Sequence, residues 1–384
     1  MTARRLEGIA PTIFTTMSAL ALRTGAVNLG QGFPDTDGPA SVRARVGAAV
    51  TEGRNQYAPG RGVPELRAAI ARHQARHHGI DLDPETEVVV TTGATEGIAS
   101  AVLGLVDPGD EVVLLEPFYD SYPAMLQMAG AVVRPVTLQA PDYRLDVDAL
   151  RAAVHDGTRL LLLNTPHNPT GTVLTDAELG VIAELAVRHD VVVVTDEVYE
   201  HLVFDGRRHR PIATWPGMAE RTLSLSSLGK SWSLTGWKVG WGTGPAPLVD
   251  AVLAVKQWTT FTSGSPLQPA AAHALDAEPD FPLELAVSLQ HRRDVLLEGL
   301  ADAGLTPRVS EGTYFTVTDV AHLGWPDGAA FCAALPERAG VVAIPMQGFY
   351  AGDAGRHLVR WAFCKDEDVI AEGLRRLRAG ELRA

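Results

Sequence analysis

Apolar segments alternate with helix-like segments through the middle of the chain. The strand-like runs cover residues 87–92, 110–116, 131–138, 158–166, 191–199 and 221–227. Most are unbroken stretches of Val and Leu, so both faces of each strand are expected to be buried. Buried strands separated by helices form a largely parallel sheet with helices on both faces. The pattern therefore predicts an α/β fold.

Helix signals and a change of pattern near the C-terminus suggest how the chain is divided. The helical run 62–79 ends at Gly79, and the run 175–190 opens with a capping box, Thr175 with Glu178. After about residue 290 a long helix, a short strand, a helix and another strand follow, which predicts a smaller α+β domain. We expect an N-terminal arm with part of the small domain (1–40), a large domain (41–285) and a C-terminal small domain (286–384).

The charge balance and the cysteines narrow the class of protein. A formal net charge of -13 argues against nucleic acid or an anionic membrane surface as the main partner. The N-terminus has no secretion-signal pattern, and no apolar run approaches the roughly 18 residues of a membrane span. Cys332 and Cys364 have no CxxC partner, so we expect free thiols and a cytoplasmic location.

Lysine is rare in this chain. Lys and Arg together number 33, and the only lysines are Lys230, Lys238, Lys256 and Lys365. The first two lie in the segment SLSSLGKSWSLTGWKVGW, residues 224–241. Because arginine supplies nearly all of the positive charge, we expect the few lysines to perform tasks that arginine cannot, such as forming an imine or accepting a proton.

Residues with chemical functions follow the strand-like runs, where open parallel sheets bind ligands. They are a Gly-rich helix start at Gly93, Ala94 and Thr95, the aromatic segment PFYDSY, Asn168, Asp196 with Tyr199, and Ser227 with Lys230. Taken singly, each has a plain structural explanation, such as a tight turn, core packing or a helix cap.

Taken together, these groups suit an aromatic, cationic, phosphorylated aldehyde, and pyridoxal 5′-phosphate meets every requirement. A lysine can form a Schiff base with its aldehyde, and a carboxylate can pair with its protonated pyridine nitrogen. A phenol and an amide can hydrogen-bond the ring oxygen, and an aromatic side chain can stack on the ring. A helix N-terminus with small residues can hold the phosphate.

Nine motifs strengthen this interpretation. In chain order from residue 28 to 365 they are NLGQGFPD, NQYAPG, GATEGI, EPFYDSY, NTPHNPTG, TDEVYEHL, SSLGKSWSLTGWKVGW, EGTYF and LVRWAFCK. They resemble the class I/II aminotransferases of PLP fold type I, most of all the kynurenine, methionine and N-succinyldiaminopimelate aminotransferase group. The resemblance implies a large domain with a mostly parallel seven-stranded sheet between helices, plus a smaller α+β domain.

The resemblance also implies an activity and an assembly. The protein would move an amino group from an L-amino acid to a 2-oxo acid, with 2-oxoglutarate as the default acceptor, by a ping-pong mechanism. It would be a homodimer whose active site is shared between subunits.

The resemblance assigns the residues around the cofactor ring. It implies Lys230 as the Schiff-base lysine and proton shuttle, and Asp196 as the partner of the pyridine nitrogen. Tyr199 and Asn168 would contact the ring oxygen O3′, and Tyr119 would stack on the ring.

The phosphate would be held by a second set of residues. The resemblance implies Gly93, Ala94, Thr95, Ser227 and Lys238, so the two lysines of the segment 224–241 have different tasks. Tyr57 in NQYAPG would reach the phosphate of the other subunit.

On the substrate side, the resemblance implies that Arg360 binds the α-carboxylate, with help from the Gly32 backbone and Asn168. Phe14, Tyr57 and the segment 258–266 would form the side-chain pocket. That segment has Ser263 and Gly264 where the kynurenine enzymes carry bulky aromatics, which favours a longer or polar side chain over kynurenine.

Four other classes of function fit the sequence less well. A cysteine-conjugate C–S β-lyase would use the same lysine and is the alternative within pyridoxal chemistry. A nicotinamide dehydrogenase is not supported, because GWGTGP at residue 240 has neither the spacing nor the strand of a GxGxxG motif. A non-catalytic module would need an added domain. The absence of HExxH and GxSxG argues against metal and serine hydrolases, and no metal site is expected.

Overall fold

The computed structural model describes residues 3–9 and 11–384. Its centre is a seven-stranded sheet with the strand order β2-β8-β7-β6-β5-β3-β4. The strands are β2 (Val88–Thr91), β3 (Glu111–Glu116), β4 (Val132–Thr137), β5 (Thr158–Asn164), β6 (Val192–Asp196), β7 (Thr222–Ser227) and β8 (Gly240–Thr243). Only β8 runs antiparallel to its neighbours. The predicted mostly parallel seven-stranded sheet is confirmed.

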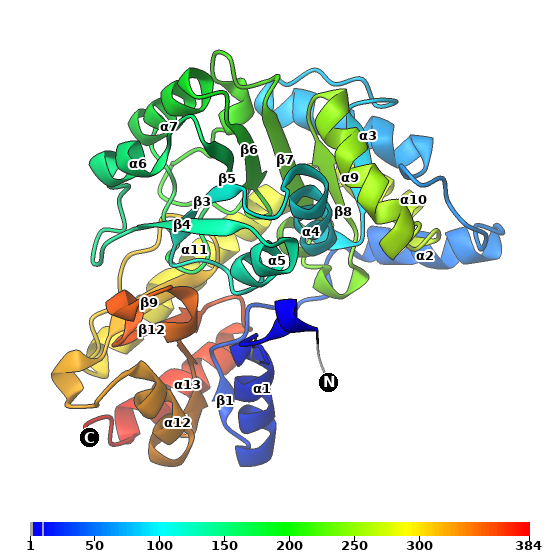
Figure 1. Cartoon of the computed structure of the whole chain (residues 1–384). Helices are drawn as coiled ribbons and strands as arrows, with labels where there is room; N and C mark the ends of the chain where they lie inside the picture. The colour runs from blue at the N-terminus through cyan, green and yellow to red at the C-terminus, as the bar shows by residue number, and fades with distance from the viewer. Residues whose placement is uncertain (1–2, 10) are drawn as a thin grey trace.

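Both faces of this sheet are buried, as the apolar runs predicted. Along β5, Leu161 and Leu163 pack on one side with α7 (Asp176–Arg188), while Leu160 and Leu162 pack on the other with α4 (Gly93–Leu105). Figure 1 shows the sheet in the upper body, with α7 and α6 (Val147–Ala153) on one side of it and α4, α5 (Ser121–Ala129) and α9 (Ala246–Thr259) on the other.

Two sequence-based expectations in this sheet are wrong. The run 191–199 is not strand throughout, because β6 ends at Asp196 and residues 197–200 form a turn closed by Glu200 N–H to the Glu197 carbonyl. The second error is β8, where no strand was expected. Its sequence GWGT has no apolar run. The strand exists because Gly240 and Gly242 allow α4 and the side chain of Leu225 to pack closely against it.

The lower body combines the two ends of the chain. Its sheet is antiparallel with the order β11 (Ile344–Pro345), β12 (Leu358–Ala362), β9 (Phe315–Asp319), and β1 (Val27–Asn28) pairs in parallel with β10 (Val341–Val342). Its helices are α1 (Ile13–Thr24), α12 (Gly328–Ala339) and α13 (Glu367–Ala379), and α11 (Phe281–Asp302) lies between the two bodies (Figure 1). The exact domain boundaries stay a prediction.

The remaining helices are α2 (Ala40–Thr51), α3 (Pro64–His78), α8 (Leu228–Ser231) and α10 (Leu267–Ala277). The predicted end of α3 is confirmed, because Gly79 takes the left-handed conformation with φ 68°. The capping box of Thr175 and Glu178 is also confirmed.

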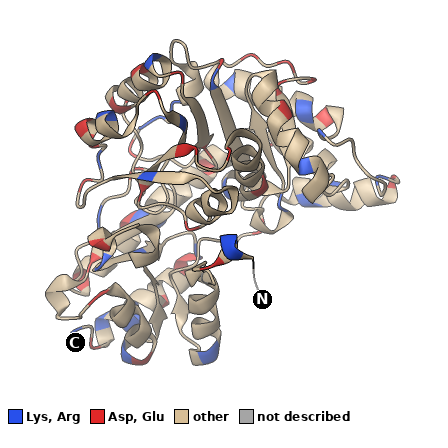
Figure 2. Ribbon diagram, in the orientation of Figure 1, with Lys and Arg blue, Asp and Glu red and all other residues tan. Residues whose placement is uncertain are grey.

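Charged residues of both signs are mixed along the outer helices, while the central strands carry few (Figure 2). The outer helices are therefore not expected to produce a single large field of one sign. Within the described part of the chain, no helix has the length and apolar character needed to span a membrane.

Candidate active site

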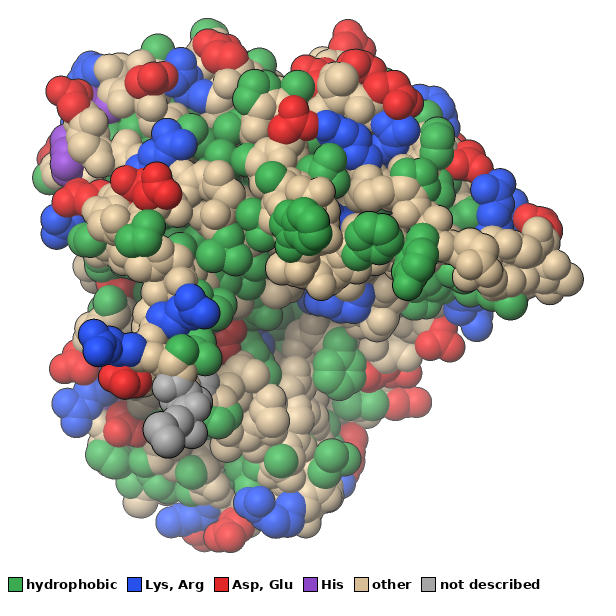
Figure 3. Space-filling model, turned by 45° about the vertical axis from the view of Figure 1, so that its right-hand side comes forward, with side chains coloured by type: hydrophobic (Ala, Val, Ile, Leu, Met, Phe, Trp, Pro, Cys, Tyr) green, Lys and Arg blue, Asp and Glu red, His purple; other side chains and the backbone are tan. Residues whose placement is uncertain are grey.

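A cavity of about 1060 Å³ opens at the carboxyl ends of β5, β6 and β7. Figure 3 shows the molecular surface hollowed between the upper and lower bodies. The cavity is lined by nearly all of the residues predicted from the sequence, namely Phe14, Gly32, Gly93, Ala94, Thr95, Tyr119, Asn168, Asp196, Tyr199, Ser227, Lys230, Lys238 and Arg360. The strand ends and the small body thus bring together residues far apart in the sequence.

Lys230 lies on the single-turn helix α8, directly after β7. Its Nζ atom lies 3.4 Å from the Gly32 carbonyl oxygen and 5.9 and 5.7 Å from the ring centres of Tyr199 and Tyr314. Burial lowers the pKa of Lys230 to about 8. A substantial fraction of the amine is therefore neutral near physiological pH, as a nucleophile or a base requires.

Asp196 ends β6 with its carboxylate in the cavity. Oδ2 accepts a hydrogen bond of 2.7 Å from the Tyr122 hydroxyl, and Oδ1 accepts one of 3.3 Å from the Val198 N–H. Burial raises the pKa of Asp196 to about 6. No Lys or Arg among the described residues forms an ion pair with this carboxylate. A buried carboxylate with neutral donors alone is suited to a cationic ligand such as a protonated pyridine.

The N-terminus of α4 forms an open cradle, because Gly93 and Gly240 have no side chains to fill it. A Cβ atom on Gly93 would meet the Lys238 Nζ at 3.2 Å, and one on Gly240 would meet the Ala94 nitrogen at 2.7 Å. The side chain of the N-cap residue Thr92 makes no capping hydrogen bond, so it does not occupy the first N–H groups of α4. Free N–H groups beside a lysine fit a phosphate.

Arg360 on β12 is fully buried and reaches the same cavity from the small body. Nη1 donates to Asn168 Oδ1 at 3.0 Å and Nη2 donates to the Gly30 carbonyl at 2.9 Å. Its Nε has no hydrogen-bond partner among the described residues, and the guanidinium lies 3.9 Å from the ring centre of Phe315. Burial lowers the pKa of Arg360 to about 10. A substrate carboxylate would supply the missing negative charge.

Three residues of the site were not found from the sequence. Tyr122 anchors Asp196. Asn164 donates from Nδ2 to the Asp196 carbonyl at 2.8 Å and accepts from the Asn168 N–H at 2.7 Å. Tyr314 donates to the Gly32 carbonyl at 2.6 Å. Tyr122 and Tyr314 lie inside the motifs EPFYDSY and EGTYF, so the motifs contained a signal for both. Asn164 ends the apolar run of β5.

Tyr57 and the segment 258–266 lie outside this cavity in the single chain. Tyr57 is 81% exposed and meets Phe261 edge-on, with the ring centres 5.2 Å apart. Ser263 is buried, with its Oγ 3.3 Å from the Thr92 hydroxyl. The roles assigned to Tyr57 and this segment require a second chain and stay predictions.

Comparison with known proteins supplies the family. Residues 24–377 match the family model for aminotransferase class I and II. The chain is 53% identical to the probable N-succinyldiaminopimelate aminotransferase DapC of Mycobacterium tuberculosis, with 98% of each chain covered. It is also 40% identical to the methionine aminotransferase of Escherichia coli, with 97% of each covered.

The chain belongs to the class I and II aminotransferases. It is also 37% identical to the mouse kynurenine–oxoglutarate transaminase 3, with 96% of this chain and 88% of the relative covered. Among solved structures, the N-succinyldiaminopimelate aminotransferase of M. tuberculosis matches with a TM-score of 0.96 over 99% of this chain and 100% of that one, at 53% identity. The aspartate aminotransferase of Thermus thermophilus with maleate matches with a TM-score of 0.92 at 33% identity, covering 99% of each chain.

These findings confirm the fold class, the aminotransferase activity and the pyridoxal 5′-phosphate cofactor. The names of the relatives favour transamination over the β-lyase alternative. The cavity fits the cofactor on its own geometry, because the cradle suits its phosphate, Asp196 its ring nitrogen and the Lys230 amine its aldehyde.

The bound cofactor supplies an electron-accepting ring that stabilises negative charge on the substrate α-carbon. In the predicted roles, Lys230 would hold the cofactor aldehyde and move the α-proton, and Asp196 would keep a proton on the ring nitrogen. Arg360 would hold the substrate carboxylate, and Asn168 would orient Arg360 through its amide oxygen. Burial of all three ionisable groups keeps bulk water from competing for them.

Proposed function

We propose that this aminotransferase acts on an N-succinylated diaminopimelate, with 2-oxoglutarate as the partner oxo acid. Such a substrate is an L-α-amino acid whose long side chain carries an amide and further carboxylates. The observation that carries the proposal is the 53% identity to the M. tuberculosis enzyme over 98% of both chains, compared with 40% for the methionine enzyme and 37% for the kynurenine enzyme.

A feature of the cavity supports a substrate with an amide. Gln347, in the short 3₁₀ helix Gln347–Phe349, lines the cavity, and its Oε1 atom is buried without a hydrogen-bond partner among the described residues. Leaving such an acceptor unpaired costs about 1–3 kcal/mol. The N–H of a succinyl amide can satisfy it, whereas the side chain of methionine has no donor. The lining of the described cavity contains no arginine besides Arg360, so we assign side-chain recognition to hydrogen bonds.

A half-reaction screen tests this proposal. The holoenzyme is mixed, without any oxo acid, with N-succinyl-L,L-diaminopimelate, methionine, kynurenine or glutamate, and the change in cofactor absorbance is followed by stopped flow. We expect the succinylated substrate to react at least about tenfold more efficiently than methionine, the difference that 1.4 kcal/mol provides. A faster reaction with methionine or kynurenine would overturn the proposal.

The Gln347→Ala variant sharpens the test. It should raise KM for the succinylated substrate about tenfold, as the loss of one buried hydrogen bond predicts, and leave the methionine reaction unchanged. Gln139→Ala, which removes an exposed glutamine, is the matched control. An equal effect of Gln347→Ala on both substrates would contradict recognition of the amide.

We also propose that the active unit is a homodimer in which the partner subunit's Tyr57 completes the phosphate site. Three aromatic side chains of the described residues are more than half exposed in the single chain, Tyr57 at 81%, Trp258 at 84% and Phe261 at 54%. Exposed aromatic groups of this size favour a protein–protein contact. Tyr57 is the predicted cofactor contact that a single chain leaves outside its own cavity.

A further inference from the structure

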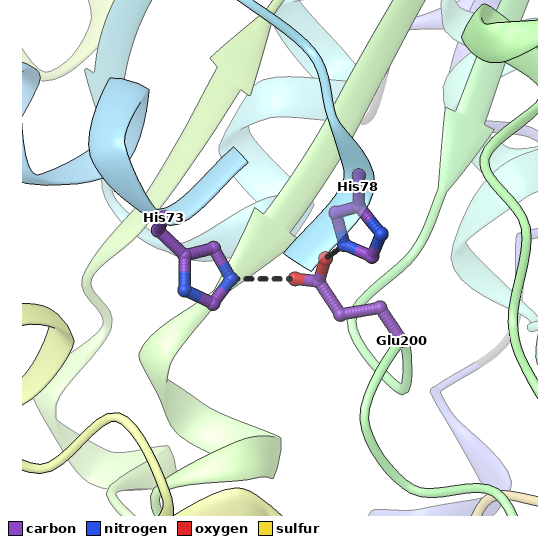
Figure 4. Close-up of side chains that lie close together, drawn as sticks. All are labelled: His73, His78 and Glu200. Atoms are coloured by element: carbon purple, nitrogen blue, oxygen red, sulfur yellow. Dashed lines mark hydrogen bonds and ion pairs between the residues drawn. The ribbon is translucent and has the colours of Figure 1, made fainter. Parts of the chain in front are cut away.

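A buried cluster of histidine and glutamate side chains lies apart from the residues that line the active-site cavity. His73, His77 and His78 come from the last turns of α3, and Glu200 and His201 lie at the end of the turn after β6. The side chains of His73 and Glu200 are 0% and 1% exposed, and that of His78 is 5% exposed. Figure 4 shows His73 and His78 on opposite sides of the Glu200 carboxylate, with both rings turned toward it.

The atoms of this cluster converge. His78 Nε2 lies 2.7 Å from Glu200 Oε2, and His73 Nε2 lies 3.9 Å from Glu200 Oε1. His201 Nε2 lies 3.1 Å from His73 Nε2. Ligand atoms around a tetrahedral Zn²⁺ are about 3.3 Å apart, because each bond is about 2.0–2.1 Å long. Small side-chain rotations would therefore bring these nitrogen and oxygen atoms to coordination distance.

Hydrogen bonding leaves the histidines incompletely satisfied. The two Nε2 atoms of His73 and His201 face each other and can share only one proton. His73 Nδ1 and His77 Nε2 are buried without a partner among the described residues, although the two rings are 4.6 Å apart at their centres. Native proteins rarely leave several buried ring nitrogens without partners, so hydrogen bonds among the described residues do not account for every ring nitrogen of the cluster.

The charges of the cluster match a divalent cation. The Glu200 carboxylate lies between the imidazoles of His73 and His78, and its Oε1 atom also accepts a hydrogen bond of 2.6 Å from the Ser226 hydroxyl. Glu197 is a second buried carboxylate close by, 3.2 Å from His209 Nε2. Both carboxylates are buried beside imidazoles, and no Lys or Arg among the described residues forms an ion pair with either of them.

We propose that His73, His78 and Glu200, whose ligand atoms all lie within 4.8 Å of one another, bind a divalent transition-metal ion of the zinc type, with His201 next to His73. Imidazole and carboxylate ligands in a tetrahedral arrangement suit Zn²⁺ and Co²⁺, whereas Mg²⁺ and Ca²⁺ prefer sites made of oxygen atoms. The site departs from the sequence-based expectation of no metal. It would join α3 to the segment that carries Tyr199, which directly precedes Glu200, and would act on stability rather than on the chemical step.

Metal binding to the tag-free holoenzyme tests the proposal. After chelator treatment and gel filtration, the protein is titrated with Zn²⁺ by calorimetry, and bound metal is counted by mass spectrometry. We expect one Zn²⁺ per chain, a higher thermal midpoint with Zn²⁺ than without it, and no comparable effect of Mg²⁺. Co²⁺ should give the visible absorption of a tetrahedral site. A wild-type protein that retains less than about 0.1 equivalent and shows no thermal shift would overturn the proposal.

Ligand variants locate the ion. His78→Gln and Glu200→Gln should each weaken Zn²⁺ binding at least tenfold, because removing even a supporting partner of a ligand typically costs 10–100-fold. His155→Gln is the matched control, since His155 also pairs with a carboxylate, Glu111 at 2.9 Å, but at the surface. Unchanged binding in both ligand variants would overturn the site. If a variant does not fold, the wild-type stoichiometry and the Co²⁺ spectrum decide.

Discussion

At the scale of single residues, burial moves three ionisable groups of the cavity toward their neutral forms. The pKa of Lys230 falls to about 8, that of Arg360 falls to about 10, and that of Asp196 rises to about 6. Each group lacks a strong counter-charge from the described residues. In the predicted roles the cofactor and the substrate would provide those charges, so the site would be electrostatically complete only with both bound.

Asp196→Asn is a prediction on the cofactor-free protein. A carboxyl group whose pKa is raised in the folded state destabilises that state as the pH rises from its unfolded value near 4 to about 6, and the full penalty persists above pH 6. The variant should therefore be more stable than the wild-type apoprotein by about 1–3 kcal/mol at pH 8, measured by urea denaturation.

The same measurement near pH 4 and on the holoenzyme provides the controls. The gain should disappear near pH 4, where both proteins carry a neutral side chain. It should be lost or reversed when the cofactor is bound, because the amide cannot balance a protonated ring nitrogen. An apoprotein variant that is less stable than the wild type at pH 8 would contradict the electrostatic account.

The chemical groups of the site could be predicted, but many of their partners could not. Asp196 and Lys230 follow the strand-like runs 191–195 and 221–227, so the sequence pattern alone identifies them as residues at strand ends. The hydrogen bond from Tyr314 to Gly32 joins residues 282 positions apart, and it depends on how the small body packs against the large one. No local pattern contains that information.

At the scale of elements, the N-terminus of α4 and the strand β8 form one unit. Gly240 passes so close to α4 that a Cβ atom would lie 2.6 Å from the Gly93 carbonyl carbon and 2.7 Å from the Ala94 nitrogen. These are backbone atoms of the phosphate cradle, so they cannot move without changing it. The strand was missed from the sequence because the property that places it, the lack of side chains, leaves no apolar pattern.

Gly240→Ala should therefore weaken binding of the cofactor. We expect the dissociation constant of pyridoxal 5′-phosphate to rise at least about tenfold, in line with an overpacking cost of about 1–3 kcal/mol, measured by equilibrium dialysis with the apoprotein. Gly236→Ala is the control, since a Cβ atom there has nothing within 4 Å. Equal affinities of the two variants would show that the close contact does not shape the cradle.

At the scale of the whole molecule, the cavity lies between two bodies, and each supplies residues that line it. The large body carries Lys230 and Asp196, while the small body carries Arg360 on β12. The sequence pattern predicted both bodies, since each has its own succession of strands and helices. It could not show how the cavity forms between them. That geometry comes from packing around α11.

Mixing two defective variants, at a cofactor concentration too low to fill the Tyr57→Ala sites, tests the proposed sharing of the site between subunits. Lys230→Ala should bind the cofactor but lose at least 10²–10⁴-fold in turnover, because it lacks the group that transfers the proton. Tyr57→Ala should bind the cofactor more weakly. In a hybrid dimer of the two, one site would combine an intact Lys230 with an intact partner subunit's Tyr57.

After refolding of an equimolar mixture, transaminase activity should rise to about a quarter of that of the wild type, since half of the dimers carry one intact site of two. Separately refolded variants, combined only in the assay, are the control. If the mixture gains nothing, Tyr57 does not act across the dimer.

The pairing of β1 with β10 affects how the protein must be made. Val27 pairs with Val341, so the first strand stays without its partner on the ribosome until almost the entire chain has been synthesised. All seven strands of the large sheet lie before residue 244 and can pair much earlier. A nascent chain can thus hold paired strands of the large sheet and an unpaired N-terminal strand at the same time, and unpaired strand edges of this kind favour aggregation.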